Sequence, residues 1–98
     1  MPTVQVDLQE GFSGERVVVH VGEQRLERQA VTTRAMLGLA DTLRAEQPPG
    51  RTAVHVEVPD REISDTFEVD VSDDVYLGVS LSGDALVPIV SAQPFGYA

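Results

Sequence analysis

The sequence contains no cysteine and no lysine. The first absence excludes disulfide bonds, zinc sites built from thiolates and catalysis by a thiol nucleophile. The second excludes the phosphate-binding glycine loop that ends in a lysine. All seven basic residues are therefore arginines. The chain lacks the residues on which several common cofactor and nucleotide sites depend.

Long apolar runs and a basic leader are also missing. No segment approaches the roughly 20 consecutive apolar residues that span a bilayer. The start, MPTVQVDLQE, has no basic region followed by an apolar one, as a secretion signal would. The net charge is −9, so the phosphates of nucleic acid and of anionic lipid would be repelled. We predict a cytoplasmic protein that binds neither nucleic acid nor membrane.

Catalytic and metal-binding signatures are equally scarce. The G-x-S-x-G motif does not occur, and Ser13 in the nearest stretch, GFSGE, is interpreted as a hairpin residue. The acidic stretch SDTFEVDVSDD lacks the spacing of a calcium loop and is typical of a solvated strand and turn. His20 and His55 could hold a transition metal with Glu57 if their strands were adjacent, but their spacing matches no metal motif. We expect no catalytic residue, no cofactor and no metal site.

Strict alternation of apolar and polar residues is the main signal that is present. It predicts half-buried strands at residues 4–8, 17–21, 54–58 and 67–71. A hairpin over residues 75–90 follows, with Ser82-Gly83-Asp84 as its turn. Pro88 cannot donate a backbone hydrogen bond, so the returning strand should lie at a sheet edge or carry a bulge.

Residues 33–46 fit two patterns. They alternate as two short strands would, yet Met36, Leu39 and Leu43 also have helical spacing, and Pro48-Pro49-Gly50 would end a helix. Gly38 weakens a helix, which favours strands. We therefore expect one domain, residues 1–98, folded as an all-β antiparallel sandwich of seven to nine short strands. A small barrel, or an α+β fold with a helix at about 33–46, is the alternative.

One stretch is similar in layout to a known kind of module. Val31-Thr32-Thr33, then Gly38, then Pro48-Pro49-Gly50 precede an alternating strand with Val54, Val56 and Val58. This order resembles that of prealbumin-like (transthyretin-like) sandwich modules, such as carboxypeptidase regulatory-like and collagen-adhesin B-type domains. The resemblance covers about a third of the chain. It implies a β-sandwich used for spacing, adhesion or protein contact.

Aromatic residues are few, and two of the five lie in the last four positions. Phe95 and Tyr97 either pack onto the sandwich or form a contact patch, joined by Phe12 and Tyr76. The lack of catalytic signatures favours a non-enzymatic protein-interaction module, whose partner is another protein or a second copy bound through an edge strand. The alternative is a small-ligand or carbohydrate binder that stacks on Tyr76 or Tyr97. A metal-dependent hydrolase built on the histidines is the least favoured hypothesis.

Overall fold

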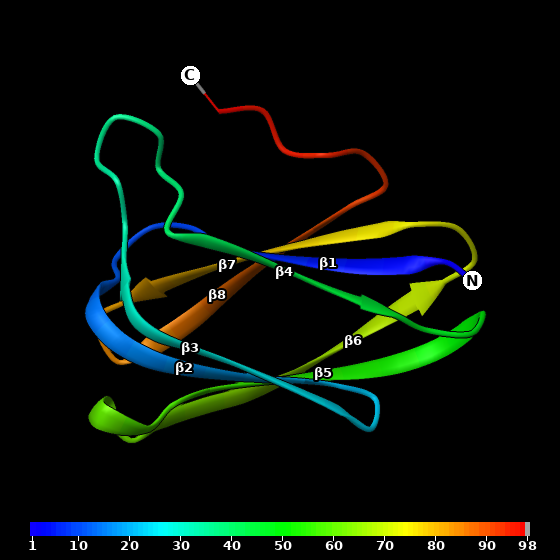
Figure 1. Ribbon diagram of the computed structural model, residues 1–98, viewed down its shortest axis with the longest axis horizontal. Helices are drawn as coiled ribbons and strands as arrows, with labels where there is room; N and C mark the ends of the chain where they lie inside the picture. Colours follow the sequence, from blue (N-terminus) through cyan, green and yellow to red (C-terminus); the bar gives the residue numbers. More distant parts are fainter. Residues whose placement is uncertain (98) are drawn as a thin grey trace.

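The computed structural model describes residues 1–97, which form a sandwich of two four-stranded sheets (Figure 1). The elements in chain order are β1 Thr3–Leu8, β2 Ser13–Val21, β3 Gln24–Thr32, β4 Asp41–Glu46, β5 Gly50–Val58, the 3₁₀ turn η1 Pro59–Arg61, β6 Ile63–Val71, β7 Val75–Ser82 and β8 Ala85–Ser91. Sheet A has the strand order β4-β1-β7-β8, and sheet B has the order β3-β2-β5-β6. All neighbours are antiparallel except β1 and β7, which are parallel. The predicted all-β sandwich is confirmed.

The core lies between the sheets and consists mainly of valines on alternate strand positions. The buried cluster comprises Val4, Val6, Leu8, Phe12, Val17, Val19, Val21, Val31, Leu43, Ala45, Val54, Val56, Val58, Val69, Val71, Val75, Leu77, Val79, Leu81 and Leu86. Removing one such aliphatic side chain from water stabilises the fold by about 1.5–3 kcal/mol. The β-branched side chains also suit the pleated strand, so propensity and burial favour the same structure.

The connection between β1 and β2 crosses from sheet A to sheet B. The sequence suggested that Ser13 is a hairpin residue, and this is wrong. Ser13 begins β2 and pairs with Thr32 of β3. Gly11 makes the crossing possible, because its φ is +91° and a Cβ there would lie 1.8 Å from the carbonyl oxygen of Leu81. Both conditions exclude a larger residue from this position.

The helix proposed as an alternative at 33–46 is absent, and only the second of the two expected strands forms, as β4. Residues 33–40 form a loop, closed by a single bridge between Arg34 and Leu39. Gly38 adopts a φ of +71°, a conformation that neither a helix nor a strand accommodates. The strand missed by the sequence prediction is β3, where Val31 is the only buried residue. An edge strand with little burial leaves no clear alternation to detect.

The four edge strands are β3 and β4 on one side of the sandwich and β6 and β8 on the other. The prediction that Pro88 lies in an edge strand is confirmed. Gly83 and Asp84 form a two-residue turn between β7 and β8, and the resulting register places Pro88 opposite Val79. In that register the missing N–H of Pro88 belongs to the free edge, so the ladder with β7 loses nothing.

Within residues 1–97 no helix is long and apolar enough to cross a membrane.

Candidate functional site

The outer faces of the two sheets differ in charge. On sheet B, arginines and glutamates pair across strands, as Arg51 with Glu68 at 3.0 Å and Arg16 with Glu27 at 3.2 Å. On sheet A, neither β7 nor β8 contains a charged residue. From residue 75 to the end of the chain, Asp84 is the only charged residue, although the whole sequence has sixteen acids and seven arginines. Interface cores are depleted of charge in this way.

Strand β8 exposes large aliphatic side chains on both sides. Val87 and Ile89 lie on the outer face of sheet A and are 45% and 53% exposed. Val90 lies on the inner side of the sheet, yet it is 55% exposed. Isolated exposed aliphatic residues are ordinary on protein surfaces. Three of them lie within four positions of one uncharged edge strand, and we call them together the β8 patch (Val87, Ile89 and Val90).

The C-terminal segment turns back over sheet A after β8 and is anchored by its last tyrosine (Figure 1). The Tyr97 hydroxyl donates to Asp7 Oδ2 at 2.6 Å and accepts from Gln9 Nε2 at 3.0 Å. Burial, together with the neighbouring Asp7 carboxylate, raises the pKa of Tyr97 to about 12. The phenol therefore stays protonated and continues to donate throughout the physiological range. The tail is a docked part of the fold.

The anchoring carboxylate is itself unusual, because Asp7 is 1% exposed. A buried charge is costly unless hydrogen bonds surround it. Besides Tyr97, Gln5 Nε2 donates to Asp7 Oδ1 at 3.0 Å and Thr42 Oγ1 donates to the same atom at 3.2 Å. In the described residues no buried side-chain nitrogen or oxygen lacks a partner. The tail thus supplies one of three side-chain donors that allow a carboxylate to be buried on this face.

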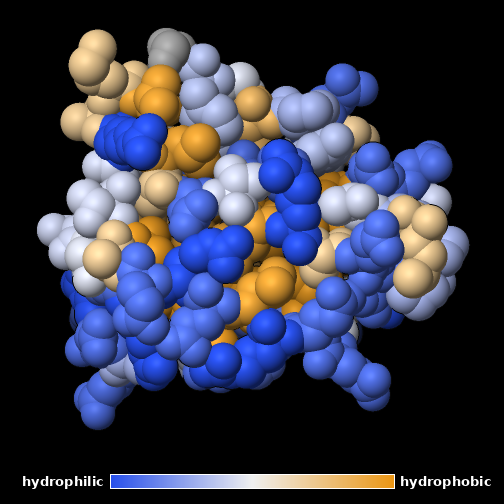
Figure 2. Space-filling model, viewed as in Figure 1, coloured by the Kyte–Doolittle hydropathy of each residue, from blue (hydrophilic) through white to orange (hydrophobic). Residues whose placement is uncertain are grey.

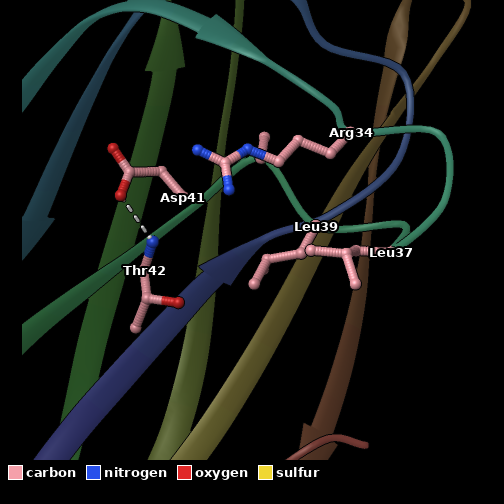
Figure 3. A pocket seen from close by; sticks show the side chains of 6 residues that line it. Arg34, Leu37, Leu39, Asp41 and Thr42 are labelled. Carbon is pink, nitrogen blue, oxygen red and sulfur yellow. Dashed lines mark hydrogen bonds between the residues drawn. The ribbon is translucent and has the colours of Figure 1, made fainter. Parts of the chain in front are cut away.

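The loop 33–40 stands over the same face and forms one wall of a shallow pocket of about 230 Å³ (Figure 3). Arg34 extends towards Asp41, while Leu37 and Leu39 lie side by side on the opposite side. Met36, at the tip of the loop, is 91% exposed. Hydrophobic side chains gather over this loop at the upper left of Figure 2. The pocket is open and smaller than the roughly 300–1,000 Å³ of typical ligand sites.

The four aromatic residues predicted to form a patch have different surroundings. Phe12 is 3% exposed and belongs to the core, because the β1–β2 crossing turns it between the sheets. Tyr76, Phe95 and Tyr97 are each half-buried. Of the four, Phe12 therefore has no surface to offer a partner.

The β8 patch was not recognised from the sequence, because exposed and buried aliphatic residues look alike in a strand pattern. The charge distribution contained a usable signal. The last 24 residues include a single charged residue, far fewer than a segment of that length elsewhere in the chain. No family model, curated protein or solved structure matches the chain. Function is therefore inferred from the geometry of the molecule.

Proposed function

We propose that the protein is a non-enzymatic interaction module that associates with a second copy of itself through β8 and the adjoining outer face of sheet A. The observation that carries this proposal is the β8 patch, an exposed aliphatic surface on an uncharged edge strand. Burying such a surface removes apolar area from water, which is the main favourable contribution to association.

Charge favours a second copy as the occupant. Two molecules that each carry −9 repel one another over most of their surfaces. Repulsion is strongest where carboxylates approach within the screening length, about 8 Å at physiological salt. A contact through β7 and β8 brings no charged residue of either strand into the interface. An acidic chain can therefore meet itself through β7 and β8 with less electrostatic repulsion than through a strand that carries carboxylates.

Pro88 limits the number of molecules that can associate through this edge. A free sheet edge can add strands without limit, and proline at an edge prevents this because it lacks the N–H that the next strand would need. Val87 and Ile89 flank Pro88 and point to the outer face, where side-chain packing needs no backbone ladder. A closed dimer held mainly by side chains is the expected form, and weak, reversible association is the expected strength.

The proposal includes two further expectations from the sequence, a prealbumin-like sandwich and a cytoplasmic location. The order Val31-Thr32-Thr33, Gly38 and Pro48-Pro49-Gly50 suggests the first. Two four-stranded sheets packed face to face support it. The small-ligand alternative gains no support from the pocket, which is lined by neither Tyr76 nor Tyr97.

A matched pair of charge substitutions tests the proposal. Ile89→Glu adds a carboxylate to the β8 patch, and Ala53→Glu adds the same charge to the exposed outer face of sheet B. The molar mass of each protein is measured by light scattering over a concentration series. We expect wild type and Ala53→Glu to approach the mass of a dimer at high concentration, while Ile89→Glu remains a monomer. Monomeric wild type at every concentration, or equal association of Ile89→Glu, would refute the proposal.

A further inference from the structure

The two histidines of the chain meet on the outer face of sheet B, on the opposite side of the sandwich from the β8 patch. His20 on β2 is the direct cross-strand partner of His55 on β5. Glu57 lies two residues beyond His55 on the same strand, so its side chain points to the same face. The condition for a metal site that the sequence left open, adjacent strands for both histidines, is met by this register.

One carboxylate oxygen of Glu57 lies near a ring nitrogen of each histidine. Glu57 Oε1 lies 3.2 Å from His55 Nε2 and 3.7 Å from His20 Nε2. Ligand atoms that bind one tetrahedral zinc ion at about 2.1 Å are about 3.4 Å from each other. The two nitrogen–oxygen separations therefore match those of a metal coordination shell. Two imidazoles and a carboxylate are also a ligand set that suits zinc and copper.

The surroundings hold the imidazole of His55 in a suitable orientation. Thr66 Oγ1 lies 2.7 Å from His55 Nδ1, on the side of the ring away from Glu57. When Nδ1 donates this hydrogen bond, the ring is fixed and the lone pair of Nε2 is left for a metal, as in established metal sites. Arg25 faces His20 across the strand pair, but its guanidinium contacts Glu27 at 2.8 Å. No described arginine pairs with Glu57.

As they are placed here, no three such side chains in residues 1–97 are arranged to hold a metal ion, so these three must move to bind one. The ring centroids of His20 and His55 are 6.0 Å apart, whereas two imidazoles on one tetrahedral ion would be about 5 Å apart. All three side chains are between 35% and 38% exposed. Rotation of the His20 side chain through solvent can therefore close the gap without disturbing the core.

We propose that His20, His55 and Glu57 bind one divalent transition-metal ion of the zinc type, with the remaining coordination position open to solvent. This assigns a binding role to residues that the sequence alone favoured as solvated strand positions. The site is independent of self-association, since it lies on the other sheet.

Nuclear magnetic resonance tests the proposal on the untagged protein, because two histidines give two resolvable sets of imidazole signals. Zinc chloride is added to the wild type and to His20→Gln, His55→Gln and Glu68→Gln. The last variant removes an exposed carboxylate from the same face but outside the cluster. We expect both imidazoles to shift together with one equivalent of zinc in wild type and Glu68→Gln. Isothermal calorimetry should give at least about tenfold weaker binding in either histidine variant.

All three side chains are partly exposed, so each variant should keep the fold, which circular dichroism checks. Calcium chloride serves as the control ion, because calcium prefers oxygen ligands and should leave the imidazole signals in place. Imidazole signals that do not move with excess zinc would overturn the proposal. So would zinc binding of unchanged strength in the His20→Gln, His55→Gln double variant, since the ion would then sit on other acidic groups of the surface.

Discussion

Tyr97→Phe tests the docking of the C-terminal segment, because it removes one oxygen and keeps the ring. The lost group donates to Asp7 Oδ2 at 2.6 Å, and Asp7 is 1% exposed. A hydrogen bond to a charged group contributes about 1.5–3 kcal/mol. Tyr97 is half-buried, so water can partly replace its hydroxyl, and we expect a loss near the lower limit, about 1.5 kcal/mol. For a domain of this size that lowers the Tm by roughly 6–12 °C.

The matched control is Tyr76→Phe, since the Tyr76 hydroxyl makes no hydrogen bond among residues 1–97 and the residue is also half-buried. Removing it should change the free energy of unfolding by less than about 0.5 kcal/mol. Urea unfolding followed by far-ultraviolet circular dichroism measures both variants in the same way, without relying on tyrosine fluorescence. Equal stability of the two variants would show that the contact with Asp7 does not hold the tail in place.

Three further predictions follow from single contacts. Gly11→Ala should lower the free energy of unfolding by about 3 kcal/mol, because a Cβ would strike a backbone oxygen of β7 in addition to the positive-φ strain. Gly14→Ala, at almost the same φ but with open space around it, should cost only about 1–2 kcal/mol in the same urea titration; equal losses would contradict the clash. Burial raises the pKa of Tyr97 to about 12, so the folded state holds this proton more tightly, and stability should fall as pH rises from about 10 to 12. The Tyr97→Phe variant should lose less over that interval, and parallel curves would refute the assignment. Burial alone would raise the pKa of Glu15, but hydrogen bonds from the Ser13 and Glu15 backbone and from Arg61 lower it below 4.5. The stabilisation that ionised Glu15 provides is present above pH 4.5 and is lost on acidification through the folded pKa. In an acid titration, Arg61→Gln should therefore lose less stability than wild type. An equal slope for the two proteins would exclude the contact.

The sequence predicted the central strands well, for a physical reason. β1, β2, β5 and β7 are covered on one face, so valine and leucine alternate with polar residues and the period is visible. The edge strand β3 buries almost nothing, so its period is lost among polar residues. Propensity alone also could not decide residues 33–40, where the left-handed Gly38 fixes a turn.

Sites were harder to predict than strands, because they depend on which faces meet. By the strand pattern Asp7 is one more outward position, yet it is buried and contacts Tyr97 of the tail and Thr42 of β4. Phe12 reads as an exposed loop aromatic, and only the crossing between sheets places it in the core. The cross-strand pairing of His20 and His55 depends on a register between two residues that are 35 positions apart in the chain. A single sequence does not contain that register.

Self-association through the β8 patch is tested most directly by crosslinking, since the chain has no cysteine to interfere. Ile89→Cys places one thiol in the proposed contact, and Ala53→Cys places one on the opposite, exposed face as the control. Both proteins are oxidised at the same concentration and the disulfide-linked dimer is followed with time. The proposed contact predicts rapid crosslinking at position 89 and slow, collision-limited crosslinking at position 53. Equal rates at the two positions would contradict it.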